Sequence, residues 1–135
     1  MFKYFPTNYV WNLSVDLAIE MGARIGEIEA MCAPLQEAAK QPDAQGTQAF
    51  RDTWAKMADQ LCDLAQEDEA AGRLFSAGEK YGRAASYLIT CERLQAHGAA
   101  GRLDLYKRML DLFDKSIRLA DENCERVEIP YEGEH

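Results

Sequence analysis

The sequence predicts an all-α fold, an antiparallel bundle of about five helices followed by a C-terminal β-strand. Apolar residues recur every three or four positions through most of the chain, and residues of turn type interrupt this pattern. The last residues change to strict alternation of polar and apolar side chains. The chain has 135 residues, 47% of them apolar and 28% charged, which suits one globular domain with its own core.

The first two helices are expected over residues 8–21 and 24–40. Asn8 is a candidate N-cap of the first helix, and Gly22 follows its end. The apolar stripe of this helix is Val10, Leu13, Leu17 and Met21. Pro34 lies inside the second segment, so we expect a kink or break just before it.

A loop is expected over residues 41–46, and a third helix, capped by Thr47, from there to residue 71. Its apolar positions are Phe50, Trp54, Met57, Leu61 and Leu64. A fourth helix is expected over residues 74–95. Its inward positions are Phe75, Gly78, Tyr81, Ala85, Leu88 and Ile89. The small side chains at Gly78 and Gly82 would let a neighbouring helix approach closely.

The last helix is expected over residues 103–123. Its apolar stripe is Leu103, Tyr106, Leu110, Phe113, Ile117 and Ala120. Residues 126–131 then alternate polar and apolar side chains, including β-branched ones, which indicates a strand. Because a single strand cannot pair with itself, we expect its sheet partners to lie in further sequence or in another chain.

Charge and cysteine content indicate a cytoplasmic protein that does not bind nucleic acid. The net charge is −8, whereas a phosphate-binding surface needs clustered Lys and Arg. No apolar run approaches the ~18 residues of a membrane span, and the N-terminus lacks the apolar run of a signal peptide. The four cysteines include no CxxC pair, so we expect free, buried thiols in a reducing compartment.

The sequence contains no complete catalytic, cofactor-binding or metal-binding motif. The GxSxG, Walker and HExxH motifs are absent, and so is a glycine-rich dinucleotide turn. Of the two histidines, His97 is placed in a loop and His135 is the last residue. Ser76 and Ser86 have no base near them in sequence. We therefore expect no catalytic residue, no cofactor and no metal in this chain.

The first residues of the chain are rich in aromatic side chains. They are Phe2, Tyr4, Phe5, Tyr9 and Trp11. These are too many for an exposed tail, which leaves two interpretations. Either the rings cover one end of the bundle, or some of them face a ligand or a partner domain.

Five segments, taken in order, carry a resemblance to a known family. They are Gly26-Glu27-Ile28, Trp54, the turn from Gly72-Arg73 to Ser76-Ala77, Tyr81-Gly82-Arg83-Ala84-Ala85-Ser86-Tyr87, and Val127-Glu128-Ile129-Pro130-Tyr131-Glu132-Gly133. In order and spacing they resemble the N-terminal helical domain of the α/β-hydrolases grouped with the FrsA-like esterases and the 2,6-dihydroxypseudooxynicotine hydrolase. The extra alanine, Ala85, before Ser86 departs from the family pattern.

The resemblance implies a cap domain over residues 1–124 and, over residues 125–135, the first strand of a catalytic α/β domain not included in this chain. Members of the family hydrolyse ester, amide or ketone C–C bonds with a serine nucleophile. The triad and the oxyanion hole would belong to the catalytic domain, so this chain alone is expected to be inactive. The cap would shape the substrate pocket and exclude water. Its pocket-facing candidates are Tyr4, Phe5, Tyr9, Trp11 and Asn12.

Two other functions stay open. Ala65, Ala77, Tyr81 and Ala84 match the offsets of one tetratricopeptide repeat, so the alternative is a stand-alone helical protein-interaction module, although no second repeat follows. A bundle that binds a small ligand is the third. The expected partners are the hydrolase catalytic domain, in the same or a separate polypeptide, and a small-molecule substrate at the domain interface. A homodimer stays open, and neither nucleic acid nor a membrane is expected as a partner.

Overall fold

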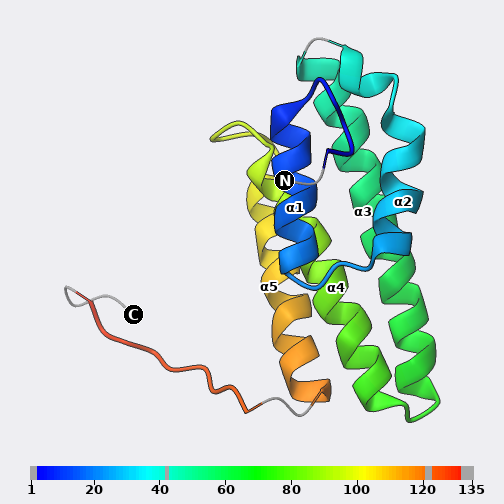
Figure 1. Cartoon of the computed structure of the whole chain (residues 1–135). Coiled ribbons are helices and arrows are strands. Elements are labelled where there is room, and N and C mark those ends of the chain that lie inside the picture. The colour runs from blue at the N-terminus through cyan, green and yellow to red at the C-terminus, as the bar shows by residue number, and fades with distance from the viewer. Residues whose placement is uncertain (1–2, 42, 121–122, 132–135) are drawn as a thin grey trace.

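The computed structural model describes residues 3–41, 43–120 and 123–131, and only the backbone of residues 43–46. Within these residues it contains five α-helices and two short 3-10 helices (Figure 1). They are α1 (Tyr9–Glu20), α2 (Ile25–Cys32), η1 (Ala33–Leu35), η2 (Ala38–Lys40), α3 (Asp43–Ala70), α4 (Leu74–Arg93) and α5 (Arg102–Leu119). The predicted all-α bundle of about five helices is confirmed for this part of the chain.

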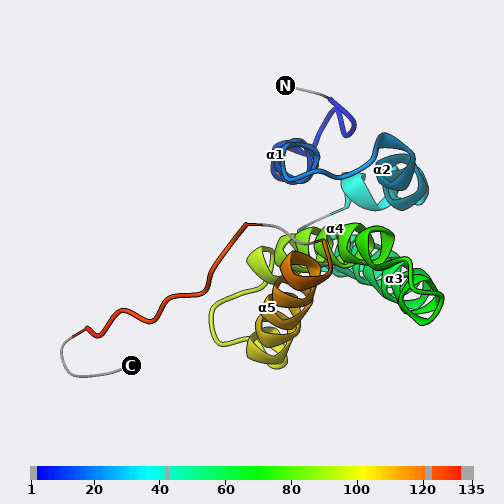
Figure 2. The same cartoon turned by 90° about the horizontal axis from the view of Figure 1, so that it is seen from below.

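The helices form two layers (Figure 2). In one layer α4 lies between α3 and α5 and packs along both of them. The other layer consists of α1 and α2, of which α1 contacts α4 and α2 contacts α3. A helix with one apolar stripe has to bury it against a second element, and two packed layers satisfy that need. The central helix is therefore α4, which has neighbours in both layers.

The predicted ends of the first helix and the predicted break in the second segment are confirmed. The Asn8 side chain accepts a hydrogen bond from the Trp11 backbone N–H at 3.0 Å, which caps α1. Gly22 follows the end of α1 with a φ of +92°, a conformation that favours glycine. The second segment breaks before Pro34, where α2 ends at Cys32 and η1 begins.

The predicted start of the third helix is wrong. Residues 41–46 were expected to form a loop before a cap at Thr47, but α3 already begins at Asp43. Residues of turn type are tolerated there because the first N–H groups of a helix need no intrahelical partner. At its other end α3 stops at Ala70, and Gly72 follows with a φ of +75°, as predicted. The fifth helix ends at Leu119, before the predicted end at residue 123.

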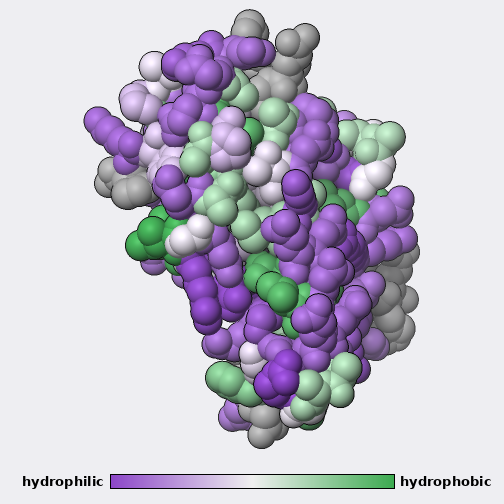
Figure 3. Space-filling model, turned by 90° about the vertical axis from the view of Figure 1, so that its right-hand side faces the viewer, coloured by the Kyte–Doolittle hydropathy of each residue, from purple (hydrophilic) through white to green (hydrophobic). Residues whose placement is uncertain are grey.

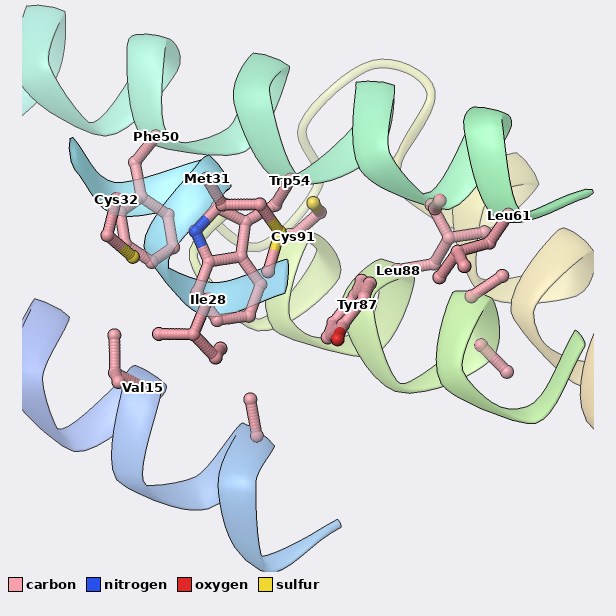
Figure 4. Close-up of a cluster of buried hydrophobic side chains, with 14 of the residues drawn as sticks. Val15, Ile28, Met31, Cys32, Phe50, Trp54, Leu61, Tyr87, Leu88 and Cys91 are labelled. Atoms are coloured by element: carbon pink, nitrogen blue, oxygen red, sulfur yellow. The ribbon is translucent and has the colours of Figure 1, made fainter. Parts of the chain in front are cut away.

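The core lies between the two layers and along α3 and α4 (Figure 4). Its largest fully buried side chains include Trp54, Phe50 and Tyr87. The Phe50 and Trp54 rings stack with centroids 4.8 Å apart, and Tyr87 meets the Trp54 ring edge-on at 5.6 Å. This chain of aromatic rings joins α3 to α4, while Ile28 and Met31 of α2 pack over it from the second layer (Figure 4).

The contact between α4 and α5 depends on glycine. A Cβ atom on Gly78 would lie 2.7 Å from the backbone nitrogen of Ala120 and 3.0 Å from the carbonyl oxygen of Ser116. A Cβ atom on Gly82 would lie 2.8 Å from the Ser116 hydroxyl. The two helices therefore approach more closely at this crossing than alanine would permit, as the small side chains predicted.

The predicted inward faces of α1 and α5 are wrong. The stripe of α1 from Val10 to Met21 is exposed, and Trp11, Val15 and Ala18 are buried instead. On α5 the inward row consists of Leu105, Met109, Leu112, Ser116 and Leu119. Because both helices carry apolar residues on two sides, periodicity alone leaves two candidates for the side that packs against the core. Phe75 on α4, also expected to face inward, is 65% exposed.

The outward apolar rows of α1 and α5, together with Phe75 of α4, are called here the α1–α5 face. It consists of Val10, Leu13, Leu17, Met21, Phe75, Leu103, Tyr106, Leu110 and Phe113. On α5, Arg108 and Lys115 form ion pairs with Asp59 and Glu69 of α3, so the polar side of α5 is turned toward α3. The apolar row therefore lies on the side of α1. The side of the molecule formed by α2 and α3 is mostly hydrophilic, with smaller separate apolar patches (Figure 3).

After α5 the described residues 124–130 have no regular secondary structure and extend away from the bundle on the side of α1 and α5 (Figures 1 and 2). The apolar side chains of Val127, Ile129 and Tyr131 are 67%, 79% and 74% exposed. The remaining part of the predicted strand, residues 132–135, lies outside the described residues. A strand formed with a partner sheet therefore stays a prediction.

Three of the four cysteines are buried thiols, as predicted, whereas Cys124 is exposed. Burial raises the pKa of both Cys32 and Cys91 to about 12. These thiols stay protonated at neutral pH, so they act as small apolar core side chains rather than as nucleophiles.

Candidate functional site

An apolar hollow beside the predicted site residues lies between α1 and α2. Its volume is about 560 Å³, within the range of small-ligand pockets. Its apolar wall consists of Ile19 from α1 and of Ile25 and Ile28 from α2, and Tyr4 also lines it. Its other lining residues are Asp16, Glu20 and Glu29. The lining thus combines an apolar wall and one aromatic ring with three carboxylates.

Tyr4 is held over this hollow by its neighbours in the N-terminal segment. The Phe5 ring is fully buried and meets the Trp11 ring edge-on at 5.1 Å. The Asn12 side chain accepts a hydrogen bond from the Phe5 backbone N–H at 2.7 Å and donates one to the Phe5 carbonyl. The Tyr4 ring packs edge-on against Phe5 with centroids 5.3 Å apart. These contacts join the N-terminal segment to α1.

The hydroxyl of Tyr4 donates a hydrogen bond to the Glu29 carboxylate on α2. Burial, together with this hydrogen bond and the negative charge of Glu29, raises the pKa of Tyr4 to about 12. The phenol therefore stays neutral and connects the N-terminal segment to α2. A neutral phenol is a wall and a hydrogen-bond donor here, not a base.

The five predicted pocket residues have different positions. Tyr4 lines the hollow, and Phe5, Trp11 and Asn12 are buried behind it in the bundle core, where they fix its position. Tyr9 is 65% exposed at the start of α1 and does not line the hollow. Phe5 and Trp11 thus pack inside the bundle rather than facing the hollow, which is closer to the first of the two interpretations of the aromatic residues. A role of these residues toward a substrate stays a prediction.

A partly buried ion pair joins the two layers. The Arg83 guanidinium of α4 lies 3.1 Å from the Glu27 carboxylate of α2, and their side chains are only 10% and 18% exposed. The Tyr87 hydroxyl donates a hydrogen bond to the same carboxylate. Burial and this carboxylate raise the pKa of Tyr87 well above its usual range. No local sequence signal identified this pair, because 56 residues separate the two partners.

A second polar cluster surrounds Asp68 at the turn between α3 and α4. Its carboxylate pairs with Arg73 at 2.7 Å and with Lys80 at 2.5 Å, and accepts a hydrogen bond from the Ser76 hydroxyl. These hydrogen bonds, first those from Lys80 and Ser76, lower the pKa of Asp68 well below its usual range. The carboxylate is satisfied by two cations, so the cluster closes the turn and leaves Ser76 without a general base.

Among the described residues no group of three or more His, Cys, Asp or Glu side chains is arranged to hold a metal ion. The other serine considered from the sequence, Ser86, donates its hydroxyl hydrogen bond to backbone carbonyl oxygens of Gly82 and Met21. Neither serine is therefore arranged as an activated nucleophile.

The α1–α5 face borders two further hollows along α4. One, of about 170 Å³, lies where Val10, Leu13 and Leu17 approach Leu94. The other, of about 360 Å³, lies where Met21 and Phe75 approach Ala120 at the end of α5. The sequence contained the apolar rows that form this face, but periodicity assigned them to the core.

None of the described helices is both long enough and apolar enough to cross a lipid bilayer. Comparison with known protein families, with curated proteins and with solved structures gives no match. The hydrolase resemblance and the tetratricopeptide-like alternative therefore both stay predictions.

Proposed function

We propose that this chain is a helical cap domain that packs through its α1–α5 face on the catalytic α/β domain of a serine hydrolase. The observation that carries the proposal is the face itself. Its apolar side chains are exposed by fractions from 36% for Leu17 to 65% for Phe75. Contiguous apolar patches of more than a few hundred Å² are rare on monomeric proteins and mark sites of association.

The extended C-terminal segment favours a partner that contains a β-sheet. Val127, Ile129 and Tyr131 alternate with polar residues and are exposed, and the segment leaves the bundle on the side of the α1–α5 face. Its extended backbone and alternate apolar side chains match what an edge of a sheet binds. A partner whose sheet takes this segment as a strand would cover the α1–α5 face at the same time.

The division of labour follows from the chemistry of the described residues. They contain two buried or partly buried polar clusters, each closed by its own ion pairs, and no activated nucleophile. The serine, the acid, the histidine and the oxyanion-hole donors would come from the partner domain. The cap would restrict access of water and set the size of the substrate, which belongs to the ester, amide or ketone class.

The test is an association experiment with the hydrolase domain encoded next to, or continuous with, this chain. The two are produced together, and the complex is measured by size-exclusion chromatography with light scattering and by titration calorimetry. Leu17→Asp and Leu110→Asp place a charge on the α1–α5 face, and each is expected to weaken the complex by about tenfold or more. Leu64→Asp is the matched control, because Leu64 is 47% exposed on α3, outside this face.

The isolated chain is expected to show no turnover of a nitrophenyl ester. Serine-inhibitor-sensitive turnover by the pure chain would contradict the proposal. So would the absence of an adjoining hydrolase domain, or a complex that resists both face variants. A homodimer that the same variants dissociate would assign the face to a second copy of the chain instead.

A further inference from the structure

We propose that the hollow between α1 and α2 binds an organic cation with an apolar body, such as an aromatic or aliphatic ammonium compound. This site is separate from the α1–α5 face, and the proposal does not depend on a hydrolase partner. The hollow has a volume of about 560 Å³, enough for a ligand of one or two rings.

The apolar part of such a ligand has a defined place. Ile28 is 1% exposed and forms part of the inner wall, and Ile25, 73% exposed, lies at the mouth. A ring inserted there would cover mainly the exposed surface of Ile25 and the partly exposed surface of Ile19. Burial of apolar surface contributes roughly 25 cal/mol per Å², so this wall supplies affinity but does not select a charge.

The charge of the ligand is selected by the rest of the lining. Three carboxylates, Asp16, Glu20 and Glu29, border the hollow, and no Lys, Arg or His is among the described residues that line it. The whole chain carries a net charge of −8, which adds to the negative potential at this site. An anionic ligand would be repelled, and a neutral ligand would gain nothing from the carboxylates.

The Tyr4 ring adds a second interaction that is specific for cations. An ammonium group over the face of a tyrosine ring is attracted by its π-electrons. The ring is fixed in place, because Asn12 binds both backbone groups of Phe5 and the Tyr4 hydroxyl binds Glu29. A metal ion is a poorer ligand, since the described residues contain no group of donors close enough to hold one.

The experiment compares three ligands of the same shape and different charge. 1-Naphthylmethylammonium, 1-naphthalenemethanol and 1-naphthoate are titrated into the ¹⁵N-labelled chain, and the backbone amide signals of Ile19, Ile25 and Glu29 are followed by NMR. The ammonium compound is expected to bind about tenfold more tightly than the alcohol, and the carboxylate more weakly than both. The preference should decrease as salt is added.

The double variant Glu20→Gln with Glu29→Gln keeps the shape of the mouth and lets the new amide oxygen accept the Tyr4 hydrogen bond. It is expected to reduce the preference for the ammonium compound to less than about threefold, while the alcohol binds as before. Glu37→Gln is the control, because the Glu37 side chain, just before η2, is 83% exposed and does not line the hollow. The proposal is overturned if the ammonium compound and the alcohol bind equally well, or if the double variant keeps the preference for the ammonium compound. It is also overturned if none of the three ligands shifts the amide signals.

Discussion

The close crossing of α4 and α5 predicts that replacing Gly78 by alanine lowers the stability of the chain, whereas the same replacement at a glycine with free space raises it. In Gly78→Ala the new methyl group would lie 2.7 Å from the Ala120 nitrogen and 3.0 Å from the Ser116 oxygen. Both are backbone atoms, so α5 itself has to move. Overpacking of this kind costs about 1–3 kcal/mol, and the better helix propensity of alanine returns about 1 kcal/mol. Because no side chain can rotate away, we expect an overpacking cost of about 2–3 kcal/mol and therefore a net loss of about 1–2 kcal/mol.

Two matched substitutions separate the packing cost from the propensity gain. In Gly82→Ala the nearest atom, at 2.8 Å, is the Ser116 hydroxyl, which can rotate away, so we expect a change of less than about 0.5 kcal/mol. In Gly26→Ala the methyl group meets no atom within 4 Å, so we expect a gain of up to about 1 kcal/mol.

The measurement is urea unfolding followed by circular dichroism at 222 nm. With a slope of about 1–2 kcal/mol per M, the midpoint of Gly78→Ala should fall by about 1 M. The midpoint of Gly26→Ala should rise. If Gly78→Ala gains as much stability as Gly26→Ala, the close crossing of α4 and α5 is refuted.

Three further predictions concern the polar clusters. The pKa of Tyr87 is raised in the folded chain, so its contribution to the free energy of unfolding is complete below the unfolded pKa of about 10 and is lost as pH rises further. In Tyr87→Phe the free energy of unfolding should therefore depend less on pH above about pH 10. The pKa of Asp68 is lowered in the folded chain, so its contribution to the free energy of unfolding is complete well above the unfolded pKa of about 4 and is lost as pH falls. In Asp68→Asn the free energy of unfolding should therefore fall less steeply below about pH 4, and an unchanged pH dependence in that range would contradict this. Arg83→Met should destabilise the chain by about 1–3 kcal/mol, and combining it with Glu27→Gln should restore part of the loss in a double-mutant cycle of urea midpoints.

The parts of the fold that could be predicted are those with a local cause. Asn8 caps α1, Gly22 follows its end, and Pro34 breaks the second segment, because each acts on backbone groups a few residues away. Which side of a helix faces the core is not local. Helix α5 has two apolar rows, and the row that carries Ser116 is the one that turns inward.

The choice of that row has a physical reason in α4. Gly78 and Gly82 leave room for a helix that presents small side chains, and Ser116 and Ala120 fit there. At the level of these glycines the other row would place the larger side chains of Phe113 and Ile117. The periodicity of the α5 sequence shows which rows of the helix are apolar, but it contains no information on the shape of the α4 surface against which one of them packs.

The candidate site could be predicted only in part for a similar reason. The aromatic residues at the start of the chain pointed to the N-terminal segment, and Tyr4 does line the hollow. The carboxylates that border it come from α1 and α2, and they have the sequence context of ordinary solvent-exposed residues. Only the packing of α1 beside α2 brings Glu20 and Glu29 to the same opening.

The paired hydrogen bonds of Asn12 have a consequence for the time scale on which the N-terminal segment opens. An amide hydrogen that is buried and hydrogen-bonded exchanges with deuterium only when the surrounding structure opens. The Phe5 N–H meets both conditions through Asn12. Its exchange should therefore be as slow as that of the α1 core, and Asn12→Ala should accelerate it to the rate of a free chain end. Residues that precede a helix are usually the first to fray; here they should be among the last.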